Sequence, residues 1–438
     1  NMAGVSHLIA HLARRGVMAK TRGLYPAPLR AVEVALNALH LSIDDGLALE
    51  RDAVTHLART AEAAHLIDLF FLREAANKHR PAAGHALPLH SAVVVGAGVM
   101  GSGIAQTLVT HGIHTLLTDV SPAAIARGVT GIHSLTHRAV KFHALTGKQA
   151  RESLDRLTAA HTAVPLTRHH LVIEAATESL ELKKKIFMDL AARTSPDTIL
   201  ATNTSALSVA SLAAAVPHPE RVIGLHFFNP AHKMPLVEVV TLPETHPDVL
   251  ATAIAFVQGL GKTPIVVQDS PGFVVNRILM PYVMEAVQLH ESGIRLETID
   301  QAMLDFGMPM GPLRLLDEIG LDVAHHVAET LSAAFPERFH PSTLLDQKIA
   351  AGHLGKKTGR GFYRHPHEVS NFRPNPQAVA DIQHRLSHLI TQEAHRCLDE
   401  GVAASAADIN LAMILGTGYP PAKGGPLTVA QASGSPPT

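Results

Sequence analysis

Residues Ala92–Gly103 read AVVVGAGVMGSG and decide the fold of this chain. The run of β-branched valines is typical of a parallel strand that is covered on both faces. Gly96, Gly98 and Gly101 follow it with the spacing G-x-G-x-x-G. The first two glycines allow a tight turn and a close approach to a pyrophosphate, and the third lets the next helix pack closely. The stretch therefore predicts a strand, a turn and a helix whose N-terminal N–H groups and dipole bind a dinucleotide.

An acidic residue after the next expected strand supports this interpretation. The strand at His114–Thr118 is followed by Asp119, which lies at the expected distance of about 20 residues from the glycines. A carboxylate there accepts hydrogen bonds from the adenosine ribose and repels a 2′-phosphate, so NAD is expected rather than NADP. The alternative is a glycine turn in an unrelated α/β protein, with Asp119 as a solvated loop residue.

The composition excludes several classes of partner. Lys plus Arg total 37 and Asp plus Glu total 38, so no bulk charge attracts nucleic acid or a membrane surface. No apolar run is long enough to span a bilayer, and no signal-peptide pattern opens the sequence. The single cysteine, Cys397, fits a reducing compartment, and the 30 histidines show no zinc-binding spacing. A cytoplasmic protein with specific local ligands is expected.

Strand and helix patterns alternate through residues 88–270, which predicts a Rossmann-like, doubly wound α/β sheet that forms the NAD-binding domain. The polar stretch from 130 to 162 is expected to be a helical excursion from that sheet. Strands are expected near residues 91–96, 114–118, 170–174, 198–202, 222–226, 236–240 and 263–267.

Helical patterns surround this domain on both sides. Residues 1–87 predict a helical extension that is interrupted at Tyr25–Pro28 and ends in a linker at Lys78–Pro88. Residues 271–365 and 366–438 predict an all-helical domain of two tandem repeats followed by a poorly ordered tail at Ala432–Thr438. The repeat pairs Arg277 with Arg385, Glu285 with Glu393, Gly293 with Gly401, Ile299 with Ile409, and Gly307-Met308-Pro309 with Gly418-Tyr419-Pro420.

Two such copies are expected to pack about a pseudo-twofold axis. Chance similarity between two alanine-rich helical segments is the alternative.

Polar residues follow the third and fourth expected strands, where ligands bind in doubly wound folds. The stretch Glu174–Lys183 comes first, and Asn203-Thr204-Ser205 follows the next strand. Ser205 offers a hydroxyl to the expected cleft, although it also suits the N-cap of the helix through Leu207 and Leu212. The two roles are compatible.

A histidine and a glutamate on the next two strands suggest acid–base chemistry. Glu238 lies among large apolar residues, where an unpaired carboxylate is costly, and His226 precedes it at the end of the neighbouring strand. A carboxylate fixes the tautomer of a histidine and stabilises its imidazolium form, as a general base requires. The alternative is a solvent-facing Glu238 on an edge strand and a packed core histidine.

A junction follows at Asp269–Arg277, where Pro271 and Gly272 end the sheet pattern. Asn276 lies one turn into the next helix and could lean over the cleft, where its amide would bind a substrate oxygen. It could equally cap or brace the junction.

These motifs in this order resemble the L-3-hydroxyacyl-CoA dehydrogenases, as found in the α subunit of the fatty-acid oxidation multienzyme complex. The likeness covers residues 91–425. It implies that His226 is the catalytic base, that Glu238 orients it, and that Ser205 and Asn276 hold the substrate oxygens. It implies cofactor contacts for Gly96, Gly98, Met100, Gly101, Asp119, Glu178, Lys183, Asn203, Ser205 and Asn229.

The resemblance also bears on the first helices, which look like the end of a hydratase domain and its linker. The segment with the paired catalytic glutamates of such a domain is missing from the sequence, so no hydratase activity is expected. The apolar stripe at Val34, Ala38 and Leu39 is expected to pack on the dehydrogenase domain, because it would otherwise stay exposed.

The expected reaction is NAD-dependent oxidation of a 3-hydroxyacyl-CoA to the 3-ketoacyl-CoA in fatty-acid β-oxidation. The alternatives are a related β-hydroxyacid dehydrogenase, and an NAD-binding structural subunit with little turnover. The expected partners are the acyl-CoA and either a thiolase subunit or further copies of the chain.

Overall fold

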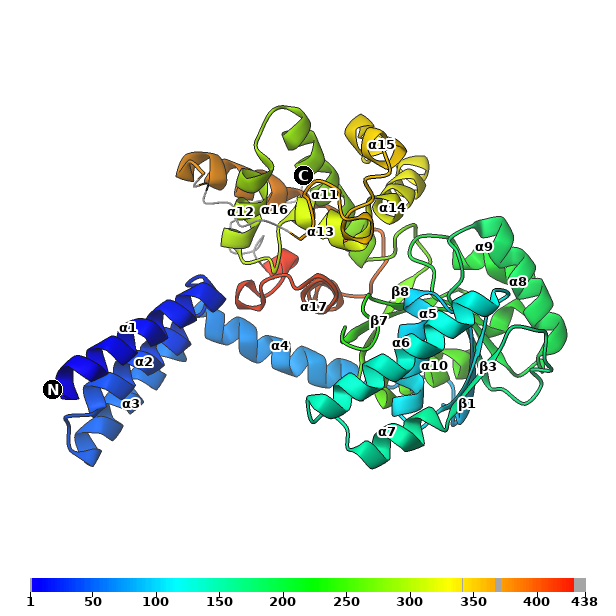
Figure 1. Ribbon diagram of the computed structural model, residues 1–438, viewed down its shortest axis with the longest axis horizontal. Helices are drawn as coiled ribbons and strands as arrows, with labels where there is room; N and C mark the ends of the chain where they lie inside the picture. Colours follow the sequence, from blue (N-terminus) through cyan, green and yellow to red (C-terminus); the bar gives the residue numbers. More distant parts are fainter. Residues whose placement is uncertain (1, 341, 367–371, 373, 429–438) are drawn as a thin grey trace.

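The chain folds into a helical N-terminal part, a sheet flanked by helices, and a second helical part (Figure 1). The computed structural model describes residues 2–340, 342–366, 372 and 374–428, so the expected tail at 432–438 lies outside the described residues. Within those described ranges, no helix combines the length and the apolarity needed to cross a membrane.

The sheet of the described chain has eight strands in the order β3-β2-β1-β4-β5-β6-β7-β8. Neighbouring strands are parallel, except that β7 runs antiparallel to β6. The predicted doubly wound α/β class is therefore confirmed. The strands are β1 (Ser91–Val95), β2 (His114–Thr118), β3 (Leu157–Ala160), β4 (Leu171–Glu174), β5 (Ile199–Thr202), β6 (Val222–Phe227), β7 (Leu236–Thr241) and β8 (Thr263–Gln268).

Both faces of the sheet are buried, because successive residues of β1 belong to different apolar clusters. Val93 lies in one cluster, whereas Ala92 and Val94 lie in the other. The carboxyl ends of β1, β2, β4, β5 and β6 meet at one edge of the sheet, where ligands bind in such folds. The associated helices are α5 (Val99–Thr110), α6 (Pro122–Lys141), α7 (Gly147–Leu154), α8 (Leu180–Arg193), α9 (Val209–Ala213), α10 (Pro247–Gly259) and the short 3₁₀ helix η1 (Pro219–Arg221).

The prediction of a helical excursion between 130 and 162 is confirmed only in part. It is helical in α6 and α7, but it ends in strand β3, which pairs with β2 at the edge of the sheet. Every side chain of β3 is at least partly exposed. An edge strand of this kind needs no apolar run, so the sequence carries no hydrophobic signal for it.

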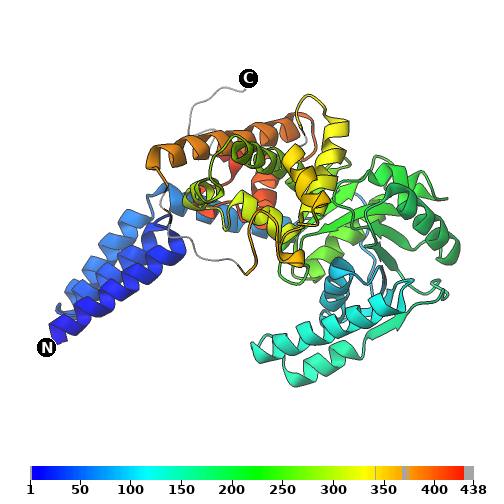
Figure 2. The same cartoon turned by 45° about the horizontal axis from the view of Figure 1, so that its top comes forward.

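The second helical part packs as two similar halves. Helix α11 lies along α16, and both belong to the upper bundle of Figure 2. Its elements are α11 (Val275–Glu291), α12 (Leu296–Phe306), α13 (Pro312–Ile319), α14 (Leu321–Ala334), α15 (Thr343–Ala350), α16 (Pro376–Asp399), α17 (Ala406–Thr417) and the 3₁₀ helices η2 (Lys356–Thr358) and η3 (Pro421–Lys423).

Reciprocal ion pairs between α11 and α16 support the predicted repeat. Arg277 Nε lies 2.9 Å from Glu393 Oε1, and Arg385 Nη2 lies 2.6 Å from Glu285 Oε1. The repeat equates Arg277 with Arg385 and Glu285 with Glu393, so each pair is the counterpart of the other. Such exchange of partners is what a twofold axis produces.

The two halves also share a turn that is closed by one short polar side chain. Asp300 Oδ1 accepts a hydrogen bond from Leu313 N at 2.9 Å, and Asn410 Oδ1 accepts one from Leu427 N at 2.9 Å. Asp300 additionally accepts bonds from Arg314 N and from the Tyr363 hydroxyl. The first half therefore buries a carboxylate where the second half has a neutral amide.

This difference predicts a pH effect on stability. Burial raises the pKa of Asp300 to about 6, although its three hydrogen bonds act in the opposite direction. A carboxyl whose pKa is higher in the folded state than the unfolded value of about 3.9 stabilises the fold below pH 4, and this contribution is lost as the pH rises through 6. We expect Asp300→Asn to remove a decline of about 2–3 kcal/mol in unfolding free energy between pH 4 and pH 7.

Urea unfolding at several pH values measures this slope. Asn410→Asp is the matched control, because it should introduce the same decline into the second half. An unchanged slope in Asp300→Asn would contradict the assignment.

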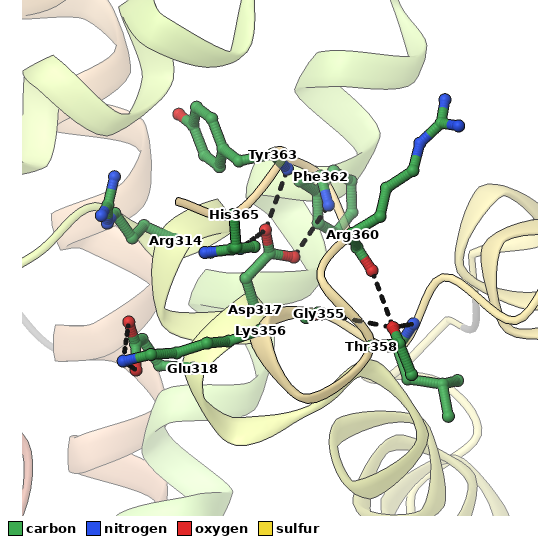
Figure 3. Close-up of polar contacts among 12 residues, drawn as sticks. Arg314, Asp317, Glu318, Gly355, Lys356, Thr358, Arg360, Phe362, Tyr363 and His365 are labelled. Atoms are coloured by element: carbon green, nitrogen blue, oxygen red, sulfur yellow. Dashed lines mark hydrogen bonds and ion pairs between the residues drawn. The ribbon is translucent and has the colours of Figure 1, made fainter. Parts of the chain in front are cut away.

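Residues 362–365, in the segment after α15, are fastened to α13 by a buried carboxylate (Figure 3). Asp317 accepts hydrogen bonds from Phe362 N at 2.8 Å and Tyr363 N at 2.9 Å, and its Oδ2 lies 3.0 Å from His365 Nε2. A Cβ on Gly361 would come within 1.9 Å of Asp317 Oδ1, so a side chain there would displace the carboxylate. These contacts fix residues 361–365 on the helical domain.

The N-terminal helices only partly follow the expectation of packing on the dehydrogenase domain. Helix α4 (Ala61–Lys78) packs on η3, β8 and α17, and His65 Nδ1 lies 2.8 Å from the Ala422 carbonyl oxygen. Helices α1 (Met2–Thr21), α2 (Pro26–Ala38) and α3 (Ile43–Leu57), however, pack on one another and project from the molecule (Figure 1).

The expected contact for the stripe at Val34, Ala38 and Leu39 is therefore wrong. Leu39 is 62% exposed, and Val34 and Ala38 line a groove of about 630 Å³ between α2 and α3. Short turns join these helices, so their apolar faces meet each other before they can reach the sheet.

Candidate active site

The glycine turn after β1 needs each of its glycines for a different reason. Gly96 has φ +103°, and a Cβ on it would come within 2.6 Å of the Ala175 carbonyl oxygen. A Cβ on Gly101 would come within 1.8 Å of the Gly96 carbonyl oxygen. Gly98 is the N-cap of α5, and a Cβ there would meet no protein atom within 4 Å. The space above Gly98 is thus open at a helix N-terminus, where a phosphate binds favourably.

Asp119 lies at the end of β2 and faces the same turn. Its Oδ2 accepts a hydrogen bond from Ala97 N at 2.8 Å, and its Oδ1 accepts one from Ser121 N at 2.9 Å. Gly96, Gly98 and Asp119 line one cavity of about 1050 Å³. The open helix terminus and the carboxylate beside it fit the diphosphate and ribose of NAD, and Met100 lies half-buried in the first turn of α5.

Glu178 is held by three groups from two segments, the residues after β5 and helix α8. Its Oε1 accepts hydrogen bonds from the Thr204 hydroxyl and from Ser205 N, the latter at 2.7 Å, and its Oε2 lies 3.2 Å from Lys183 Nζ. The Glu178 side chain is 25% exposed, whereas that of Lys183 is 1% exposed. Glu178 is therefore open to a ligand, and Lys183 lies beneath it as a support.

The segment after β5 corrects one prediction. The N-cap of the following helix α9 is Ser208, whose hydroxyl accepts a hydrogen bond from Ser211 N, so the N-cap role considered for Ser205 is wrong. Asn203 Oδ1 accepts a bond from Phe227 N at 2.8 Å and joins the ends of β5 and β6. Asn229 is exposed just beyond β6.

His226 and Glu238 form the predicted hydrogen bond. They are register partners across β6 and β7, and 2.7 Å separates His226 Nδ1 from Glu238 Oε2. A carboxylate only accepts, so Nδ1 carries the hydrogen and Nε2 is left free to take a proton. Glu238 is fully buried, and its Oε1 accepts bonds from Val274 N and Val275 N at the start of α11.

The rings of Phe228 and Phe273 pack around His226, with centroids 4.4 and 5.7 Å from its own. The imidazole is consequently fixed by packing as well as by its hydrogen bond.

Asn276 reaches back from α11 to the segment after β5. Its Nδ2 donates a hydrogen bond to the Ser205 carbonyl oxygen at 2.9 Å. The bracing role considered for it is thus present, and contact with a substrate through its Oδ1 stays a prediction.

The sequence drew attention to the stretches that contain Asp269 and Glu174, but it did not reveal what these two side chains contact at this edge of the sheet. Asp269 accepts hydrogen bonds from Val209 N, Ala210 N and the Ser208 hydroxyl, so it caps α9 across the junction. Glu174 and Thr202 lie beneath the site and are bonded to each other. The segment Asp269–Phe273 was conspicuous in the sequence, but its partner helix lay sixty residues earlier. Among the described residues, no cluster of three or more ligating side chains could hold a metal ion.

A dinucleotide site beside a fixed histidine–carboxylate pair defines an NAD-dependent dehydrogenase. Residues 91–270 match the family described as 3-hydroxyacyl-CoA dehydrogenase, NAD binding domain, and residues 272–365 match its C-terminal domain. The chain belongs to the 3-hydroxyacyl-CoA dehydrogenase family.

Individual relatives agree with this assignment. The fatty acid oxidation complex subunit alpha of Shewanella frigidimarina is 35% identical over 436 residues, which are 96% of this chain and 61% of that protein. The chain thus spans about three fifths of the length of the curated relatives it matches.

Solved structures match over most of their own length. The structure of 3-hydroxybutyryl-CoA dehydrogenase from Escherichia coli shares 33% identity and a TM-score of 0.71, covering 80% of this chain and 92% of that one. The (S)-3-hydroxybutyryl-CoA dehydrogenase of Ralstonia eutropha shares 40% identity and a TM-score of 0.60, covering 64% of this chain and all of that one.

Proposed function

We propose that this chain oxidises L-3-hydroxyacyl-CoA thioesters to 3-ketoacyl-CoA thioesters with NAD, as a step of fatty-acid β-oxidation. The observation that carries the proposal is the His226–Glu238 pair, 2.7 Å apart, on the sheet edge that also holds the glycine turn and Asp119. Family membership supports the thioester substrate, because the matched families and relatives are named for hydroxyacyl-CoA or hydroxybutyryl-CoA.

The mechanism follows from the arrangement of the side chains. Bound NAD supplies the hydride acceptor. His226 Nε2 takes the proton of the substrate hydroxyl, and the buried Glu238 stabilises the imidazolium that results. Ser205 and Asn276 position the oxygen functions of the substrate, since their segments are joined by a hydrogen bond. Asp119 would hold the adenosine ribose, Glu178 is open to the cofactor beside the Ser205 segment, and Asn203 and Asn229 lie at the ends of the neighbouring strands.

The proposal also covers the partner subunit and the cellular compartment of the chain. The relatives named as complex subunits support a partner subunit, with a thiolase or further copies of the chain as the candidates. A cytoplasmic site of action is supported by the free, buried Cys397.

A related β-hydroxyacid dehydrogenase and a structural subunit with little turnover are the competing functions. Steady-state reduction of acetoacetyl-CoA with NADH, followed at the nicotinamide absorbance, separates the three. Turnover with the thioester but not with free acetoacetate is expected. Turnover of free acid alone would favour the first competitor, and NADH binding without turnover would favour the second.

Cofactor choice gives a further prediction. We expect Asp119→Ala to raise the KM for NADH roughly 10- to 100-fold, because it removes charge-assisted hydrogen bonds to the ribose and the bond that braces Ala97 N. The kcat should change less, since Asp119 is remote from the reacting atoms.

Asp119→Asn should narrow the preference for NADH over NADPH. Asp189→Ala, which removes a charge from the same cavity, is the control. Equal efficiency of the unmodified protein with NADPH would contradict the prediction.

A further inference from the structure

Strand β4 ends in a carboxylate that the proposed mechanism does not use. Glu174 follows three buried apolar residues and is itself fully buried. It lies opposite Val95 on one side and Thr202 on the other, so it stands between the glycine turn and the segment that carries Ser205. In doubly wound sheets the ligand binds above this position, where the strand order reverses.

Every contact of Glu174 goes to a group that shapes the edge of the sheet. Its Oε1 accepts hydrogen bonds from Ala176 N and from Lys183 Nζ, both at 2.7 Å. Its Oε2 accepts bonds from Lys183 Nζ at 2.9 Å and from the Thr202 hydroxyl at 2.8 Å. One carboxylate therefore joins the loop after β4, helix α8 and the end of β5.

These contacts continue to the surface of the site through two charged groups. Lys183 Nζ, held by both oxygens of Glu174, also lies 3.2 Å from Glu178 Oε2. Glu178 is partly exposed and accepts the N–H of Ser205. The sequence of contacts thus runs from a buried anion through a buried cation to an anion that a ligand can touch.

Stability alone is a poor reason for this arrangement. Two buried charges lose their hydration, and their mutual attraction seldom exceeds what well-packed apolar side chains would provide. Apolar residues already fill the rest of β4, so another one would suit the strand itself. A fixed direction for Lys183, in contrast, determines where the Glu178 carboxylate lies.

We infer that Glu174 is a positioning residue for the cofactor site: it holds Lys183 so that Glu178 and the Ser205 segment keep the geometry that NADH binding requires. The inference rests on the proposed function, because it takes Glu178 as a contact of NAD. It concerns an acid that touches neither substrate nor cofactor.

The test compares NADH affinity, measured by fluorescence titration of the full chain, with thermal stability. Glu174→Gln keeps the size of the side chain but removes its charge, and we expect the Kd for NADH to rise about 10-fold, the effect of losing about one charge-assisted hydrogen bond. The matched control is Glu393→Gln, which removes the charge of an equally buried ion pair with Arg277 in the helical domain. It should lower the melting temperature comparably and leave the Kd unchanged.

A double variant tests whether Glu174 acts through Lys183. Lys183→Met alone should also raise the Kd, and combining it with Glu174→Gln should add little further, because both changes interrupt the same contact. Additive effects would overturn the proposed route. Steady-state kinetics should show the change mainly in the KM for NADH rather than in kcat.

The outcomes separate this inference from the proposed function. Failure of the unmodified chain to bind NADH refutes the proposed function. Binding by the unmodified chain with an unchanged Kd in Glu174→Gln refutes the inference, whatever the melting temperature. If Glu174→Gln does not fold, Thr202→Val removes the hydroxyl that donates to Glu174; the same oxygen also accepts the weaker, 3.3 Å bond from Thr204 N. A Kd raised a few-fold in that variant supports the inference, and an unchanged Kd overturns it.

Discussion

Replacing His226 by glutamine should lower kcat for acetoacetyl-CoA reduction by about 10²- to 10⁴-fold, the range that a positioned general acid–base group contributes. Glutamine can still donate a hydrogen bond to Glu238, so the buried carboxylate keeps a partner and the fold should survive. It has no group that gains or loses a proton near neutral pH. NADH affinity should stay close to that of the unmodified chain, because the glycine turn and Asp119 lie on other strands.

Steady-state kinetics and fluorescence titration of NADH measure the two quantities separately. The control is His218→Gln, an exposed histidine just before the opposite end of β6, which should leave kcat unchanged. A His226→Gln variant that keeps a tenth or more of the activity would rule out the base. Loss of NADH binding together with kcat would instead point to a structural role.

Glu238→Gln should reduce kcat less than His226→Gln does. The amide oxygen can still accept hydrogen bonds from Val274 N and Val275 N or from His226, but the negative charge that stabilises the imidazolium is gone. The order of the two effects therefore tests whether Glu238 acts through His226.

The sequence predicted those parts of the fold that local pattern specifies. The glycine turn, Asp119 and the buried strands carry apolar runs or fixed spacings, and the His226–Glu238 bond followed from the cost of burying a lone carboxylate. Arg277 could be equated with Arg385, and Glu285 with Glu393, because the repeat recurs with its glycines and prolines, whereas the Arg277–Glu393 ion pair became visible only in the structure.

Features that depend on distant segments could not be predicted in this way. The N-cap of α9 is Ser208 rather than Ser205 because Asp269, on the far side of two strands, holds that turn. Strand β3 lacks an apolar run because it lies at an edge. The pairing of Glu174 with Lys183 is decided by where α8 crosses the sheet, which no spacing in the sequence reveals.

The prediction that the apolar stripe of the first helices packs on the dehydrogenase domain fails for a related reason. Apolar spacing indicates an amphipathic helix face but not what covers it: short turns make α1–α3 pack on one another, and Leu39 stays 62% exposed.

Replacing each of two glycines in the turn after β1 by alanine should impair NADH binding for different physical reasons. Gly98→Ala places a methyl group in open space, with φ −73° already suitable for alanine, so the melting temperature should not fall. The methyl group occupies the volume that the diphosphate must enter, so the Kd for NADH should rise about 100-fold or more, as expected when the helix terminus can no longer be approached.

Gly101→Ala should abolish NADH binding and lower stability together. Its methyl group would lie 1.8 Å from the Gly96 carbonyl oxygen, and that backbone cannot move without displacing the contact between Gly96 and Ala175. We expect a loss of about 1–3 kcal/mol in unfolding free energy, typical of forcing extra volume into a packed site. Gly259→Ala, where a Cβ meets nothing within 4 Å, is the control for both quantities. Wild-type affinity in Gly98→Ala would show that the diphosphate does not cross this turn, whereas destabilisation of that variant would show that its effect on binding is indirect.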